Sequence, residues 1–89
     1  MKIIPLVNDT HKYKAVFDDG KTTKFGASGY TDYIMSHEKD RRDRYRDRHA
    51  KDLLTHDPTK AGYLSYYLLW GSSTNLNKNI AEYKKRFHV

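Results

Sequence analysis

The chain has 89 residues and a formal net charge of +6, from 17 basic and 11 acidic side chains. It contains no cysteine, which excludes disulfides, thiol catalysis and cysteine-ligated zinc and favours an intracellular setting. Its apolar runs are shorter than the ~20 residues that span a bilayer, so no membrane span is expected. We predict one compact domain over residues 1–89, β-rich over residues 1–26 and helical over residues 28–89.

The first segment, residues 3–7, is apolar and contains Pro5. Proline cannot donate a hydrogen bond to a neighbouring strand, so this segment is expected to be an edge strand or an extended arm. Residues 8–10 form a turn cluster that separates it from the next segment.

The clearest local pattern is a hairpin. In residues 12–17, the set Tyr13, Ala15 and Phe17 alternates with the set Lys12, Lys14 and Val16. The sequence Asp-Asp-Gly follows at 18–20 and marks a turn between two strands. A three-residue loop with Gly20 in the left-handed conformation places Phe25 on the apolar face, whereas a two-residue loop places Lys24 there. Because burial selects the register, we predict the three-residue loop. The apolar face then consists of Tyr13, Ala15, Phe17, Thr23 and Phe25.

Two helices are expected after the connector at residues 26–29. A short helix through residues 30–34 comes first, with Ser28 as its N-terminal cap. A longer helix then extends from His37 to Leu54. Its predicted inward face consists of Tyr45, His49 and Leu53, joined by Ala50 and Leu54.

Two further helices complete the chain. The pair Asp57-Pro58 is a strong start signal for the third, which runs through residues 63–70 and ends at Gly71. Residues 63–70 are apolar on nearly every side, so this helix is expected at the centre of the fold or under a partner. The last helix is capped by Thr74 or Asn75. Its core stripe is Leu76, Ile80, Tyr83 and Phe87.

These segments define an α+β fold. An N-terminal antiparallel β-hairpin or three-stranded sheet is expected to pack against three to four helices.

The positive charge is concentrated in the last third of the chain. Residues 58–89 carry five bases and one acid, whereas residues 31–57 carry seven of each. Cations without neighbouring acids can contact phosphates in a way that is independent of sequence and sensitive to salt. The alternative interpretation is that these cations only keep the protein soluble. The predicted nucleic-acid-binding residues are Lys78, Lys84, Lys85 and Arg86 in the last helix, extended by Lys12, Lys14 and Lys24 on the hairpin.

The arginine-rich stretch at residues 38–52 is less cationic than it looks, because seven bases are interspersed with five acids. A run of alternating sign is usually a solvated, internally paired helix face, and pairing reduces the counterion release that drives polyanion binding. The pairs expected from helix spacing are Asp40 with Arg44, Asp47 with Lys51, and Asp43 with Arg46. The alternative interpretation is a secondary phosphate contact through Arg41, Arg44 and Arg48, which share one helical stripe.

Catalytic and metal-binding interpretations have little support in the sequence. His49 and His56 are seven residues apart, whereas helical metal ligands are typically four apart, so we expect His49 at the edge of the core and bonded to an acid. The segment at residues 26–29 lacks the pattern of a phosphate-binding loop. No enzyme activity, metal or cofactor is predicted.

The tyrosines could stack unpaired bases. Tyr45, Tyr67 and Tyr83 fall on apolar helical faces and are expected in the core. Tyr30 and Tyr66 are freer to contact a partner.

Three blocks of sequence resemble a known family. The blocks are Lys24-Phe25-Gly26-Ala27 with Gly29-Tyr30 and Asp32-Tyr33, then Arg44-Tyr45 with Arg48-His49, then Asp57-Pro58-Thr59-Lys60-Ala61-Gly62 running into Leu68-Leu69-Trp70. Together they resemble small basic proteins encoded by large double-stranded DNA viruses of algae and protists, over residues 12–87. The resemblance implies a viral context but no activity and no catalytic residue. Leu64-Ser65-Tyr66-Tyr67 replaces the family's aromatic-serine-arginine-aromatic run, so no role for that arginine carries over.

The sequence therefore predicts a small, basic, non-enzymatic viral module that contacts nucleic acid without sequence preference. The alternative is a minor virion or capsid structural protein that docks onto protein neighbours. Expected partners are nucleic acid or an acidic protein surface, with capsid proteins under the alternative. The expected location is the infected host cell, in cytoplasm or nucleus, with the virion as a second location.

Overall fold

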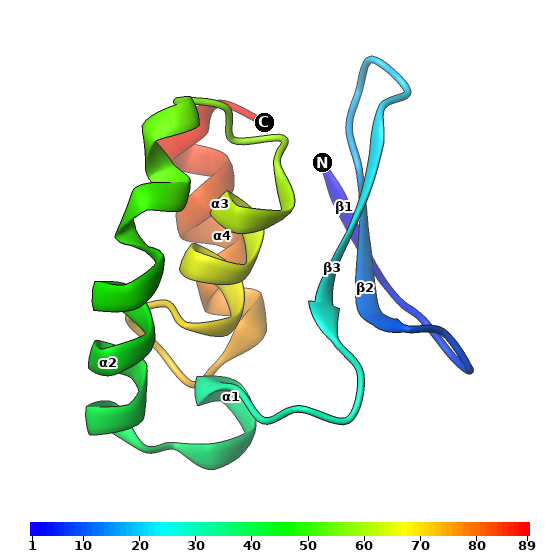
Figure 1. Cartoon of the computed structure of the whole chain (residues 1–89). Helices are drawn as coiled ribbons and strands as arrows, with labels where there is room; N and C mark the ends of the chain where they lie inside the picture. The colour runs from blue at the N-terminus through cyan, green and yellow to red at the C-terminus, as the bar shows by residue number, and fades with distance from the viewer.

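The computed structural model describes residues 1–89, with a sheet along one side of a group of helices (Figure 1). The sheet is antiparallel, with strand order β1-β2-β3. The predicted α+β fold, with a three-stranded sheet packed against helices, is confirmed. The elements are β1 (Lys2–Pro5), β2 (His11–Val16), β3 (Thr22–Ala27), α1 (Tyr33–Ser36), α2 (Lys39–His49), the 3-10 helix η1 (Ala50–Thr55), α3 (Ala61–Leu64), the π-helical turn η2 (Ser65–Leu69) and α4 (Leu76–Phe87).

The hairpin has the predicted register. Tyr13 lies opposite Phe25 and Ala15 lies opposite Thr23. The loop closes with the backbone N–H of Phe17 donating to the carbonyl of Lys21 at 2.9 Å. Gly20 has a φ of 89°, the left-handed conformation that glycine adopts without strain. Strand β1, which contains Pro5, is an edge strand as expected.

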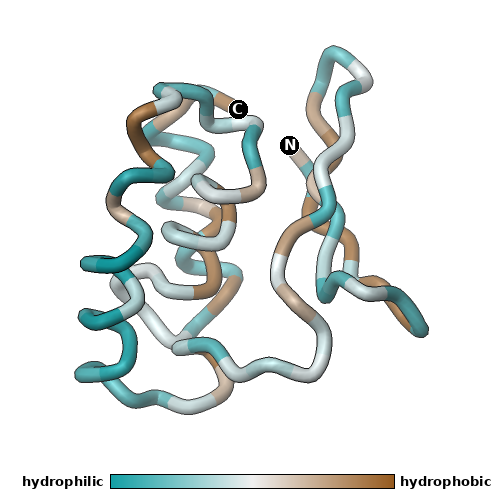
Figure 2. Tube along the Cα trace, viewed as in Figure 1, coloured by the Kyte–Doolittle hydropathy of each residue, from teal (hydrophilic) through white to brown (hydrophobic).

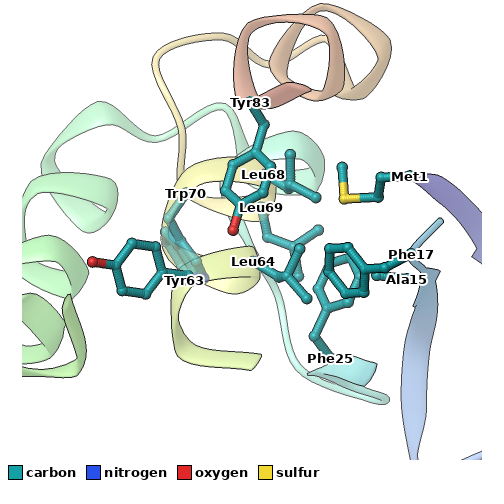
Figure 3. Packing of buried hydrophobic residues seen from close by; sticks show 10 residues of the cluster. All are labelled: Met1, Ala15, Phe17, Phe25, Tyr63, Leu64, Leu68, Leu69, Trp70 and Tyr83. Carbon is teal, nitrogen blue, oxygen red and sulfur yellow. The ribbon is translucent and has the colours of Figure 1, made fainter. Parts of the chain in front are cut away.

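The core lies between the sheet and the helical segment α3–η2. Figure 3 shows Phe17 and Phe25 pointing from the sheet toward Leu64, with Tyr83 approaching from α4. Burial of this apolar surface is the main stabilising term for a domain of this size. The central position of residues 63–70 is thus confirmed. The buried cluster is Met1, Ala15, Phe17, Phe25, Tyr63, Leu64, Leu68, Leu69, Trp70 and Tyr83.

The first two helices differ from the prediction at their ends. Asp32, not Ser28, caps α1, and its Oδ1 accepts from the backbone N–H of Met35 at 2.9 Å. The long helix begins at Lys39 and narrows to a 3-10 helix from Ala50 onward. Ala50 and Leu54 are both exposed in this 3-10 segment, so their predicted places on the inward face are wrong.

The segment at Asp57-Pro58 forms a turn and not a helix start. The hydroxyl and the backbone N–H of Thr59 both donate to Asp57 Oδ1, at 2.6 and 2.9 Å, and these bonds lower the pKa of that carboxyl. An Asp side chain that bonds two residues ahead caps such a turn as readily as it caps a helix. The helix therefore starts at Ala61.

Helix α4 follows the prediction closely. The Asn75 side chain caps it by accepting from the backbone N–H of Lys78 at 3.2 Å. Its stripe of Leu76, Ile80, Tyr83 and Phe87 packs against the core. No helix of the protein is both long enough and apolar enough to cross a bilayer.

Candidate nucleic-acid interface

The predicted cations of α4 are all exposed, but they do not form one patch. A helix turns ~100° per residue, so Arg86 and Lys84 lie on opposite flanks, about 160° apart. Lys78, Lys85 and Arg86 lie on the flank that also carries Glu82. The structure thus brings three of the four predicted α4 residues together and leaves Lys84 apart from them.

The hairpin lysines do not extend this surface. Lys14 and Lys24 lie on the face of the sheet opposite the core side chains, whereas α4 packs on the core side (Figure 1). Lys24 donates to Asp9 Oδ2 at 2.8 Å, and with the backbone N–H of His11 it lowers the pKa of Asp9 to about 2. Of the two, Lys14 alone has no carboxylate partner.

Lys12 has a structural contact of its own. Its ammonium donates to Asp32 Oδ2 at 2.7 Å, and the two side chains are only 16% and 3% exposed. Asp32 is also the cap of α1, so this ion pair ties strand β2 to the start of the helical region. A buried carboxylate of this kind needs its partner, because an unpaired buried charge is costly. Lys12 is therefore not a free cation.

The internal ion pairs predicted for the arginine-rich stretch are absent. Asp40 with Arg44, Asp47 with Lys51, and Asp43 with Arg46 are not among the pairs that form. The observed pairs are Glu38 with Arg41 at 3.3 Å, Arg42 with Asp43 at 3.0 Å, and His49 with Asp52 at 3.0 Å. Arg44 and Arg48 are exposed without a carboxylate within 4 Å. The trace of α2 is hydrophilic over most of its length (Figure 2), and no α2 residue is fully buried.

Two arginines outside the predicted site residues, Arg42 and Arg46, join α2 to other parts of the fold. Arg42 lies over the ring of Tyr33, 5.0 Å from its centroid. Arg46 donates from Nε to the backbone carbonyl of Trp70 at 2.8 Å and lies 5.4 Å from the centroid of Tyr66. Both positions flank Tyr45 on the inward stripe of α2, and this spacing is the signal that could have identified them.

Arg46 also lines a polar cavity, which we term the arginine–tyrosine pocket. It has a volume of about 360 Å³, within the range of about 300–1,000 Å³ that is typical of small-ligand sites. It lies between α2, η2 and α4. Its principal lining residues are Arg46, Tyr66, Tyr67, Asn79, Glu82 and Arg86.

The pocket is lined both by Arg86, from the cationic flank of α4, and by Arg46, from α2. The guanidinium of Arg86 lies 4.9 Å from the ring centroid of Tyr67. Glu82 accepts from the hydroxyl of Ser72 at 3.2 Å and is the pocket's one carboxylate. With two guanidinium groups and one carboxylate, the lining keeps a net positive charge.

One histidine, His49, bonds to a carboxylate and packs against the aromatic side chains of the core. His49 Nδ1 lies 3.0 Å from Asp52 Oδ2, and the ring stacks on Tyr45 at a centroid distance of 4.1 Å, which confirms the predicted bond to an acid. Tyr45 stacks in turn on Trp70 at 4.3 Å. No group of three or more His, Asp or Glu side chains is arranged to hold a metal ion.

The fold and this site define a small α+β module with a cationic and aromatic surface pocket. The chain belongs to a family of unknown function, DUF5754, which it matches over residues 1–49. That match spans the sheet, α1 and α2, so it includes Arg46 and ends before Tyr66 and Arg86. No curated protein and no solved structure matches the chain.

Proposed function

We propose that the protein is a non-enzymatic basic module that contacts nucleic acid without sequence preference. The observation that carries this proposal is the flank of α4, where Lys78, Lys85 and Arg86 are exposed and only Glu82 offsets them. Lysine and arginine contacts to phosphates release condensed counterions, and this release drives binding whatever the base sequence. The three blocks that resemble proteins of large DNA viruses support action in an infected host cell, in cytoplasm or nucleus.

The second candidate function is docking onto protein neighbours as a minor virion component. Tyr30, Met35 and Leu54 favour it, because they are large apolar or aromatic side chains that are 72%, 65% and 73% exposed. Such side chains would pack against a capsid protein and not against phosphates.

The proposed surface predicts a specific loss of affinity. Changing Lys78, Lys85 and Arg86 to glutamate should weaken DNA binding by at least about tenfold, because three phosphate contacts become repulsive. The slope of log K against log salt should become shallower by about 2 to 3 units for duplex DNA. Fluorescence anisotropy with one labelled duplex at two salt concentrations measures both quantities.

A matched control separates the site from net charge alone. Lys2, Lys39 and Lys51 are exposed and lie away from α4, and changing them to glutamate alters the net charge by the same amount. This control should retain most of the affinity. Equal losses in both variants would contradict the α4 surface, and a wild-type protein without salt-dependent binding would rule out the proposed function.

A further inference from the structure

We propose that the arginine–tyrosine pocket receives one unpaired base with its flanking phosphate, so that the protein prefers single-stranded to duplex DNA. This inference rests on the proposed function and specifies its ligand. It also goes beyond phosphate contact, because a pocket with aromatic walls is not needed to bind a phosphate backbone.

The two cations of the pocket are held in position before any ligand arrives. The bond from Arg46 Nε to the Trp70 carbonyl uses one of its five N–H donors and leaves its terminal amino groups free. Arg86 is held over the ring of Tyr67 at 4.9 Å. Neither guanidinium forms an ion pair with a carboxylate. A planar guanidinium with free donors matches a phosphate in two parallel hydrogen bonds.

The tyrosines supply the surface for a base. Tyr66 and Tyr67 are half-buried and meet edge to face, with centroids 5.0 Å apart. Tyr63 and Tyr83 donate from their hydroxyls to the backbone carbonyls of Leu53 and Pro58, whereas the hydroxyls of Tyr66 and Tyr67 bond to no protein group. The ring of Tyr67 already packs against Tyr83, Phe87 and the guanidinium of Arg86. Tyr66 has Tyr67 as its one aromatic neighbour, so it is the ring on which a base can stack, and the free hydroxyls can bond to the edge of the base.

The position of these groups explains the preference for a single strand. The rings belong to the wall of a pocket between three helical segments, so a base reaches them only after leaving its own stack. In a duplex that step also breaks a base pair, whereas a single strand offers its bases freely. Duplex DNA is then limited to backbone contacts with Lys78, Lys85 and Arg86.

Replacing Tyr66 with leucine tests the inference. This change removes the aromatic face and keeps charge and most of the volume. Affinity for a single-stranded 12-nucleotide DNA should fall by about tenfold, the effect of one lost base stack, while affinity for the matching duplex should stay within about twofold. Tyr30→Leu is the control, because Tyr30 is 72% exposed and does not line this pocket. It should change neither affinity.

The outcomes separate this inference from the proposed function. Equal, salt-dependent binding of the wild type to both DNAs would overturn the inference and leave the proposed function standing, whereas no binding to either would remove both. Loss of single-strand and duplex affinity together in Tyr66→Leu would also overturn the inference. Photocrosslinking of the wild type to an iodouracil-containing single strand does not depend on how a variant folds. It should yield adducts at Tyr66 or Tyr67, and adducts elsewhere only would contradict the pocket.

Discussion

Replacing Leu68 with alanine should lower the free energy of unfolding by about 3 kcal/mol. The Leu68 side chain has no exposed surface and lies in the cluster that joins the sheet to the helices (Figure 3). Its removal both loses buried apolar area and leaves a cavity that close-packed neighbours fill only in part. The whole free energy of unfolding of an 89-residue domain is only a few times larger than this loss. Urea unfolding followed by circular dichroism should therefore show a large shift of the midpoint to lower urea concentration.

Leu54→Ala is the matched control, because the same atoms are removed from a side chain that is 73% exposed. Its effect should stay within about 0.5 kcal/mol. If the two variants unfold at the same urea concentration, the core does not lie where the structure places it.

Replacing Gly71 with alanine should destabilise the protein by about 3 kcal/mol, at the upper end of overpacking effects. A Cβ at Gly71 would lie 2.1 Å from the backbone carbonyl oxygen of Tyr67 and 3.1 Å from the Asn79 side chain. The obstacle is mostly backbone, so no side-chain rotation relieves it. The π-helical turn would have to shift, and with it the tyrosines that line the arginine–tyrosine pocket. Thermal unfolding by circular dichroism measures the loss.

Asn77→Ala is the control for this prediction, because Asn77 is exposed on α4 and gains a good helix former. It should leave the melting temperature unchanged or slightly raised. An equally stable Gly71→Ala protein would show that the chain does not pass this close to Tyr67.

The sequence predicts that Gly71 ends a helix, and Gly71 does follow η2. The structure adds the reason that no other residue fits there, which is the close approach of the backbone of Tyr67.

The sheet and the last helix were predictable because one pattern decided each of them. In the hairpin, a slip of one residue would have turned Phe25 outward, so the apolar alternation determined the loop length. In α4, the spacing of four apolar residues determined the buried face. The turn at Asp57 was mispredicted because an Asp side chain satisfies a turn or a helix start equally well. The cap of α1 was mispredicted because Ser28 and Asp32 are both good cap residues, and the sequence alone does not choose between them.

The site was only partly predictable for a different reason. Composition identified Arg86 and its neighbours as unbalanced cations, but it could not show that Arg46 approaches from another helix. Pairing by helix spacing also failed for the arginines of α2. Spacing accounts only for partners on the same helix, whereas Arg42 and Arg46 contact aromatic rings and a carbonyl from elsewhere in the chain. Exposed i,i+4 pairs gain too little to outweigh such contacts.

The location of the nucleic-acid surface is tested most directly by amide chemical shifts of the wild-type protein. A titration with a single-stranded 12-nucleotide DNA, followed in two-dimensional ¹⁵N–¹H spectra, should shift the signals of Arg46, Tyr66, Gly71, Lys85 and Arg86 first and furthest. Largest shifts on the hairpin at Lys14 and Lys24, or along Arg41, Arg44 and Arg48 of α2, would contradict the assignment of the interface to the flank of α4.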